Sequence, residues 1–428
     1  MRIDARQFAA PAHTRDERPL VWLTLLLIGT LLNVVQAAES TGQVTSHGAP
    51  LAREADGQAW RFGALYTGEY LHNLRGGLER GGAYIDNLDL TLQIDGERAF
   101  GVPGLTAMVY GLYNNGGSIS GRYVGDAHAI SNIETTQALR LFELWLDWQF
   151  GAGRGRSLRV GLYDLNSEFD ASDVASLFMN SAQGIGVDFS QAGLNGPSIF
   201  PVTSLAARLE WPLADGWRLR GAVLDGVPGD PRHPKATAVK LGNGDGALYV
   251  AEIERSAASL RFVIGHWRFT TTFDDLLQVD ADGVPLQRDG SHGTYAFVEG
   301  ELWRSAAGAR RLTGVARVGV ASPDVNPVHH TLRLGLVLHS PFADGGEDQL
   351  GLALATLRNG DPYRRSAYAG GMPLLRSETN VELTWRLAVN DWLTVQPNLQ
   401  WVDNPGSDAT VGNAWVLGLR FELGGASH

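Results

Sequence analysis

Beyond residue 37, this 428-residue chain has no apolar run of the roughly eighteen residues that a transmembrane helix needs. Hydrophobic and polar residues instead alternate in segments of about ten. In Asn87–Asp95, which reads NLDLTLQID, every second residue is Leu or Ile. Successive side chains of a β-strand point to opposite faces, so this period predicts strands with one apolar and one polar face.

Two further segments allow the faces to be assigned residue by residue. In Leu139–Phe150, the alternation places Phe142 and Leu144 on the apolar face, opposite Glu143 and Trp145. In Glu378–Val389, it places Leu383 on the apolar face and Thr384 on the polar face. This polar face carries more charged residues than a strand face needs merely to contact solvent.

The N-terminus predicts export. Arginines in residues 2–18 precede an apolar run of about sixteen residues, Leu20–Val35, and Val35-Gln36-Ala37 offers small residues for cleavage. We interpret residues 1–37 as a secretory signal peptide. An uncleaved anchor helix is the competing interpretation, and it would need nearer twenty apolar residues.

The links between the predicted strands separate a membrane barrel from a soluble sandwich. About sixteen strands can be delineated, and short links such as Leu213–Gly216 and Asn390–Asp391 alternate with long ones such as Asn166–Val202 and Thr271–Gly293. Outer-membrane barrels sort their links in this way, with short periplasmic turns and long extracellular loops. We therefore predict an all-β fold, a transmembrane antiparallel β-barrel over residues 59–428, after a short periplasmic segment at 38–58.

Composition excludes several function classes. The formal charge of −11 and the presence of only two lysines argue against a nucleic-acid partner, and the absence of cysteine removes thiolate metal sites and cysteine nucleophiles. Asp280, Asp282 and Gly283 lack the later ligands of a calcium loop, and His329-His330 has no further spaced ligands. We expect no metal, no cofactor and no enzymatic activity.

Several segments resemble the carbohydrate-selective outer-membrane porins of the OprB family. The most specific is Gly161–Ser181, GLYDLNSEFDASDVASLFMNS, and Leu71–Asp95 and Gly196–Pro201 are also similar. The resemblance covers most of the chain after residue 37, is weakest from about 271 to 375, and implies a sixteen-stranded, sugar-conducting barrel. One departure is the end of the chain, where Phe421 is followed by seven more residues although such barrels commonly finish on the aromatic residue that the assembly machinery reads.

In a barrel of this size an aqueous channel remains unless a loop narrows it, and Asn166–Val202 is long enough to fold inward as a constriction. Carboxylates, guanidinium groups and aromatic faces are suitable partners for a neutral, hydroxyl-rich solute. The alternative for each charge is that it hydrates the lumen or pins the loop to the wall. The candidate pore-lining and sugar-contact residues are Glu143, Trp145, Asp147, Arg159, Tyr163, Asp164, Glu168, Asp170, Arg80 and Asp89.

The expected function is passive, selective diffusion of carbohydrates across the outer membrane. The first alternative is a weakly selective general porin. Two further alternatives are a barrel enzyme that modifies lipid or lipopolysaccharide and a barrel that serves as an adhesin or receptor. The expected partners are carbohydrate solutes, outer-membrane lipid and lipopolysaccharide, and the barrel-assembly machinery.

Overall fold

The computed structural model describes residues 58–424, apart from positions 152, 154, 215, 243, 258, 343–345 and 373. The predicted signal peptide, and all but the last residue of the predicted periplasmic segment, lie outside the described residues.

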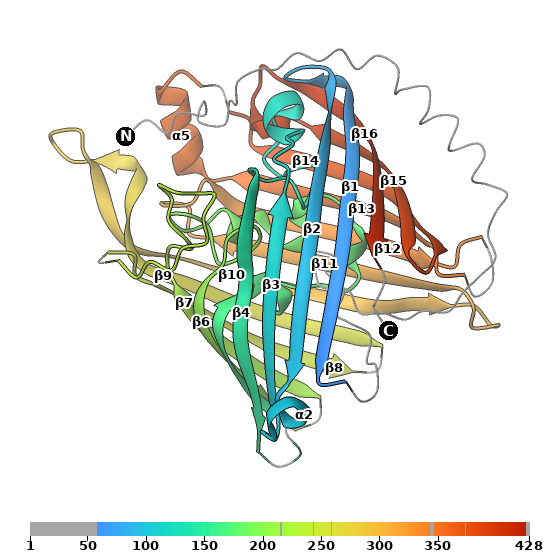
Figure 1. Ribbon diagram of the computed structural model, residues 1–428. Helices are drawn as coiled ribbons and strands as arrows, with labels where there is room; N and C mark the ends of the chain where they lie inside the picture. The colour runs from blue at the N-terminus through green and yellow to red at the C-terminus, as the bar shows by residue number, and fades with distance from the viewer. Residues whose placement is uncertain are drawn as a thin grey trace.

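Sixteen strands of the described chain close into one antiparallel barrel, in which each strand pairs with its neighbours in sequence and β1 pairs with β16. Figure 1 shows the closure, with blue β1 beside red β16. The fold class is therefore confirmed. The strands are β1 (Trp60–Gly77), β2 (Gly81–Asp95), β3 (Leu105–Asn114), β4 (Ala138–Phe150), β5 (Arg156–Tyr163), β6 (Ser204–Pro212), β7 (Trp217–Asp225), β8 (Ala247–Ala257), β9 (Leu260–Val279), β10 (Pro285–Arg304), β11 (Arg311–Ala321), β12 (Val328–His339), β13 (Gln349–Asn359), β14 (Ser377–Asn390), β15 (Leu393–Asp403) and β16 (Gly412–Gly424).

The helices are short and lie in the links. None in the described residues combines the length and the apolar character needed to cross a membrane. They are α2 (Gly96–Phe100), the π-helix η3 (Ser120–Val124), the 3₁₀ turns η5 (Leu165–Ser167), η6 (Ala175–Leu177) and η7 (Pro405–Ser407), and the α-helices α3 (Ser181–Gly184), α4 (Val187–Ser190) and α5 (Asp361–Ala369).

The outer face of the barrel is an apolar band, as the alternation predicts. Leu383 on β14 is exposed to the outside, whereas its neighbour Thr384 is buried inside. Exposed Trp303 and Trp392 lie near the end where the short turns are, and Phe342 packs edge-on against Trp385 there, with ring centroids 4.9 Å apart. An apolar band flanked by aromatic side chains is typical of a membrane-spanning barrel.

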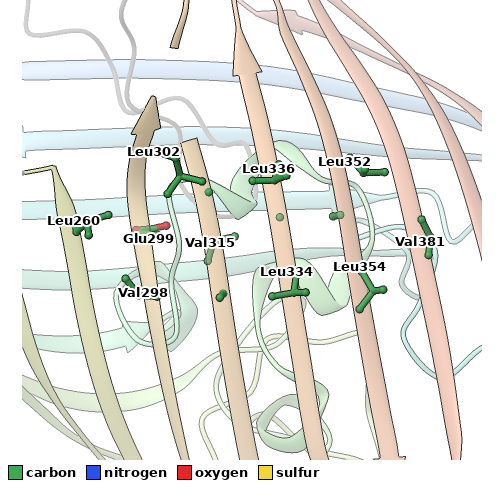
Figure 2. A pocket seen from close by; sticks show the side chains of 14 residues that line it. Leu260, Val298, Glu299, Leu302, Val315, Leu334, Leu336, Leu352, Leu354 and Val381 are labelled. Carbon is green, nitrogen blue, oxygen red and sulfur yellow. The ribbon is translucent and has the colours of Figure 1, made fainter. Parts of the chain in front are cut away.

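A hollow of about 450 Å³ on this outer face lies over β10 to β14 (Figure 2). Leu334 and Leu354 frame one row of it, and Leu336 and Leu352 frame the next. Beside Leu336, on the neighbouring strand β11, the outer face of the second row carries only Gly314. The hollow exists because this small residue leaves space that a larger side chain would fill.

The prediction that Phe142 faces outward was wrong. Its side chain is 2% exposed and packs inside against Tyr110, with ring centroids 5.0 Å apart. A β-bulge causes the change, because Tyr110 pairs with Glu143 while the next residue, Gly111, pairs with Leu141. The extra residue lets Phe142 and Glu143, although adjacent, both point inward.

The link lengths are also less strictly sorted than predicted. The expected loop over Thr271–Gly293 is largely a hairpin, because β9 runs to Val279 and β10 begins at Pro285. Figure 1 shows this hairpin projecting past its neighbours. The first link is a tight turn at residues 78–80, since β1 continues to Gly77. These three strands pair beyond their apolar, membrane-height segments, so hydropathy alone did not mark their ends.

Candidate functional site

The β5–β6 loop (residues 164–203) runs inside the barrel, where its green trace is visible in Figure 1. It enters at Asp164, whose carboxylate accepts a hydrogen bond from the Asn166 backbone N–H (3.0 Å) and so caps η5. The Asp164 backbone N–H donates to the buried Glu143 on β4 (3.0 Å). The loop therefore leaves its strand already turned toward the lumen.

A buried arginine on β11 holds the middle of this loop. Arg317 donates from Nη2 to Asp170 (2.6 Å) and from Nη1 to Asp188 (2.6 Å), and all three side chains are fully buried. A Cβ at Gly186 would lie 2.1 Å from the guanidinium carbon, so glycine is needed for this approach. Removing one partner of such a buried group costs about 3–5 kcal/mol, which makes this cluster a strong anchor.

Carboxylates on the far wall bind the backbone of the same loop. Glu382 on β14 accepts hydrogen bonds from the N–H groups of Met179 (2.7 Å) and Asn180 (3.0 Å). Glu299 on β10 accepts from the Val174 N–H (3.2 Å) and from the Ser172 hydroxyl. The loop thus spans the lumen from β4 to β14.

Apolar contacts reinforce these bonds. Phe189 stacks on Trp267 of β9, with centroids 5.0 Å apart and planes 4° apart. On the opposite wall, Phe178 packs over Gly351 of β13, where a Cβ would lie 2.8 Å from the ring. Polar and apolar contacts together fix the loop on two sides of the barrel.

The β3–β4 loop (residues 115–137) also folds inward, which the sequence did not predict. Glu378 on β14 accepts hydrogen bonds from the backbone N–H groups of Ala127 (2.8 Å) and His128 (3.0 Å). Gln400 on β15 donates to the Ile130 carbonyl (2.8 Å). This loop therefore fills the side of the lumen next to β14 and β15.

The two loops bind each other. The Asn132 N–H donates to the Met179 carbonyl (2.7 Å), and the Ser181 N–H donates to the Ala129 carbonyl (3.0 Å). A hollow of about 180 Å³ lies between the loops, and polar groups including His128, Glu134, Asn166 and Gln191 line it. The loops thus form one connected plug that narrows the lumen.

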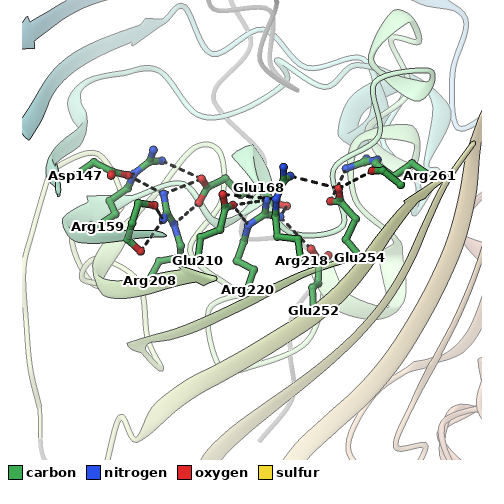
Figure 3. Close-up of polar contacts among 12 residues, drawn as sticks. Asp147, Arg159, Glu168, Arg208, Glu210, Arg218, Arg220, Glu252, Glu254 and Arg261 are labelled. Carbon is green, nitrogen blue, oxygen red and sulfur yellow. Dashed lines mark hydrogen bonds and ion pairs between the residues drawn. The ribbon is translucent and has the colours of Figure 1, made fainter. Parts of the chain in front are cut away.

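Arginines and acids form two adjoining groups of ion pairs across β4 to β10. A hydrogen bond from Arg220 to the Glu168 carbonyl (2.6 Å) joins the two groups into what we call the arginine ladder (Figure 3). At most positions an arginine of one strand faces an acid of the next on the inward face, but Arg159 of β5 and Arg208 of β6 are directly opposite each other. Its members are Asp147, Arg159, Glu168, Arg208, Glu210, Arg218, Arg220, Glu252, Glu254, Arg261 and Glu299.

At one end of the ladder, Asp147 accepts from Arg159 (2.9 Å) and Arg208 (2.8 Å). Arg208 also contacts Glu168 of the loop at 2.7 Å. Burial raises the pKa of the Glu168 carboxyl, but Arg159 and Arg208 outweigh it and lower the pKa to about 2. Glu168 is therefore ionised at neutral pH. The guanidinium of its partner Arg159 also lies over the ring of Trp145, 3.9 Å from the ring centroid.

At the other end, Arg218 contacts Glu254 (3.3 Å), and Arg261 contacts Glu299 (2.6 Å). The side chain of Arg218 is 43% exposed and that of Arg261 is 24% exposed, whereas Arg208 is 2% exposed. The ladder therefore presents its charges to the open lumen mainly at this end.

The structure brings together Asp147, Arg159, Glu168, Trp145 and Tyr163 among the predicted site residues, and Tyr163 donates its hydroxyl hydrogen to Glu168. The others lie elsewhere. Glu143, Asp164 and Asp170 are buried anchors of the loop, Asp89 is buried and accepts from the Tyr110 hydroxyl (2.6 Å), and Arg80 lies in the exposed β1–β2 turn.

Sequence reasoning missed the ladder residues beyond β5. The signal was present, because Arg208 and Glu210 flank the outward Leu209, and Glu252 and Glu254 flank the outward Ile253. Charges alternating with outward apolar residues in a barrel strand must point inward.

Comparison with known proteins identifies the family of this chain. Residues 79–424 match the model of the carbohydrate-selective porin, OprB family. Porin B of Pseudomonas aeruginosa is 26% identical over 404 residues, which cover 85% of this chain and 87% of that protein. A putative porin of Acinetobacter baylyi, QuiX, is 21% identical over 403 residues, covering 87% and 90% of the two chains.

Among solved structures, the high-pH structure of Pseudomonas putida OprB aligns with a TM-score of 0.76 at 20% identity, covering 86% of this chain and 94% of that one. The channel DcaP of Acinetobacter baumannii aligns with a TM-score of 0.53 at 10% identity, covering 90% and 100%. These likenesses agree with the barrel fold.

Proposed function

Because this chain belongs to the OprB family of carbohydrate-selective porins, we propose that sugars cross it along the exposed part of the arginine ladder, beside the plug formed by the two inward loops. The protein is an outer-membrane carbohydrate porin. What we propose is the route of the sugar through the barrel and the identity of the residues that select it.

The observation that supports this route is the exposure of one part of the ladder. The plug is bonded to β14 through Glu378 and Glu382, and it is also bonded to the ladder through Glu299 and Arg261. The side chain of Arg218 nevertheless stays 43% exposed, and that of Arg261 stays 24% exposed. A solute entering the lumen therefore meets the ladder as the accessible polar wall.

The ladder is suited to a neutral solute with many hydroxyl groups. Arginines donate and carboxylates accept hydrogen bonds, and both types alternate along the wall, so a sugar can exchange one set of bonds for the next. Each charge is already paired, so the ladder binds a free ion less strongly than an unpaired charge would. Weak, repeated contacts suit a channel, because the solute must also leave.

The plug supplies the size limit. The hydrogen bonds between its two loops hold the plug together, which supports a restricted opening rather than a wide pore. We propose that transport is passive, with no covalent step and no cofactor. The alternative is a weakly selective general porin, and the experiment below distinguishes it from a sugar-selective one.

Liposome swelling with a neutral hexose and an amino acid of similar size tests the proposal. Arg218→Ala and Arg261→Ala should each reduce the hexose rate several-fold relative to the amino-acid rate. Arg386→Ala is the matched control, because Arg386 faces the lumen from β14, pairs with Glu422 (3.0 Å) and lies outside the ladder. Unchanged relative rates in both ladder variants would refute the route, and equal rates for both solutes in the unmodified protein would favour a general porin.

Assembly is a second expectation that the family suggests. Phe421 lies within β16, which continues to Gly424, and it pairs with Gly68 of β1 at the barrel seam. We propose that the assembly machinery reads the alternating apolar face of β16 despite the residues that follow Phe421.

A further inference from the structure

The outer wall of the barrel carries a group of basic side chains where lipid is expected. On β9 and β10, Arg268 and His292 are directly opposite each other, and both are exposed. On β12 and β13, His330 and Arg358 are likewise opposite and exposed. All four share the outward face with the apolar band, at the end of the barrel that carries the long loops.

Within the described part of the chain, these arginines have no acidic partner. Among the residues that the structure describes, no carboxylate lies within ion-pair distance of Arg268 or Arg358. Outward positions at the same end of other strands hold the acids Asp86, Asp225 and Asp403, and on β9 the exposed acid Asp274 lies six residues beyond Arg268. An unpaired cation beside an apolar surface is costly unless an anion joins it.

The apolar hollow lies directly below the basic group. On β12 the outward series runs from His330 through Leu332 to Leu334 and Leu336, and the last two line the hollow of about 450 Å³ (Figure 2). At about 3.3 Å per residue, Leu334 lies about 13 Å along the strand from His330. On β13, Arg358 is followed in the same way by Leu354 and Leu352.

We propose that this surface binds one molecule of lipopolysaccharide through its phosphorylated, multiply acylated lipid portion. One phosphate is bound by Arg268 and His292, a second is bound by Arg358 and His330, and an acyl chain occupies the hollow. Guanidinium and imidazole N–H groups donate to phosphate oxygens, and the leucines contact the hydrocarbon.

The spacing supports two phosphates rather than one. His292 and His330 are separated by one intervening strand, β11, where His292 lies beside Ser322 and His330 pairs with Val320. Two spacings of about 4.8 Å between strands and an offset of two residues along the strand place the histidines about 12 Å from each other. A single phosphate cannot reach both pairs at once, whereas a lipid with a phosphate at each end of a disaccharide can.

Native mass spectrometry of the purified, folded protein with bisphosphorylated lipid A tests this site. We expect one bound lipid, at least tenfold weaker binding by the double variant Arg268→Gln/Arg358→Gln, and weaker binding by Ala316→Phe, which fills the hollow from β11. Arg311→Gln is the matched control, because Arg311 is exposed at the opposite end of β11, and it should bind like the unmodified protein.

Measurements on the unmodified protein keep the test independent of variant folding. Monophosphorylated lipid A should bind more weakly than the bisphosphorylated form. Phosphatidylglycerol should not displace the bound bisphosphorylated form. Equal binding of both lipid A forms, equal displacement by phosphatidylglycerol, or full binding by a double variant with normal heat-modifiable migration would each overturn the assignment.

Discussion

The guanidinium group of Arg317 contacts the carboxylate of Asp170 at 2.6 Å, although the two residues are 147 positions apart in the chain. The contact joins the β11 wall to the loop between β5 and β6. Because it is fully buried, it links loop position to barrel integrity in a way that an exposed ion pair does not.

Arg317→Met should release the β5–β6 loop. The change leaves Asp188 buried without its cation and leaves Asp170 only the more distant Arg333 (3.9 Å). Removing the cation from such a buried group costs about 3–5 kcal/mol, which the loop can avoid by leaving its position. Single-channel recordings should then show a larger and noisier conductance. The control variant Arg218→Gln, at a half-exposed ladder position, should not change the conductance. An unchanged conductance in Arg317→Met would show that the loop does not limit the pore.

Glu168→Gln should alter the response to acid. The pKa of Glu168 in the folded protein, about 2, is below its ordinary value of 4.5, so its ionised form stabilises the fold above about pH 4.5 and this contribution is lost as the pH falls toward 2. A shift of this size corresponds to about 3 kcal/mol. The melting temperature should therefore fall more between pH 5 and pH 2 in the unmodified protein than in the variant, and parallel curves would contradict the ion-pair account.

Opposite faces of one strand should respond differently to charge. Leu90 on β2 is 49% exposed on the outer face, whereas Gln93 on the same strand belongs to the lumen face. An arginine facing lipid near mid-membrane costs about 2–4 kcal/mol in barrel proteins. Leu90→Arg should therefore reduce the heat-modifiable folded fraction on gels, with little change for Gln93→Arg, and equal losses would argue against a membrane band at Leu90.

The orientation predicts which links are accessible on intact cells. β1 begins and β16 ends at the barrel end with the short turns, which in outer-membrane barrels faces the periplasm. Tags inserted near Pro231 or Asp282 should be labelled from outside, and a tag at Asn390-Asp391 should not. The reverse pattern would invert the proposed orientation and with it the lipopolysaccharide site.

The amino-acid sequence by itself determined the strands and most of their faces. Side-chain direction in a strand has a period of two, so the alternation in Asn87–Asp95 and around Leu383 carries both the element and its orientation without reference to any distant residue. The long β5–β6 loop and several of its acids were also visible, because length and composition are local properties.

Only the tertiary structure decided which charges meet and which loops enter the lumen. Phe142 turns inward because a bulge forms opposite Tyr110, and the β3–β4 loop folds in because Glu378, about 250 positions away, binds its backbone. Asp170 became a buried anchor and Arg261 part of an exposed ladder for the same reason. Such pairings depend on barrel closure, which brings together residues whose separation along the chain carries no periodic signal.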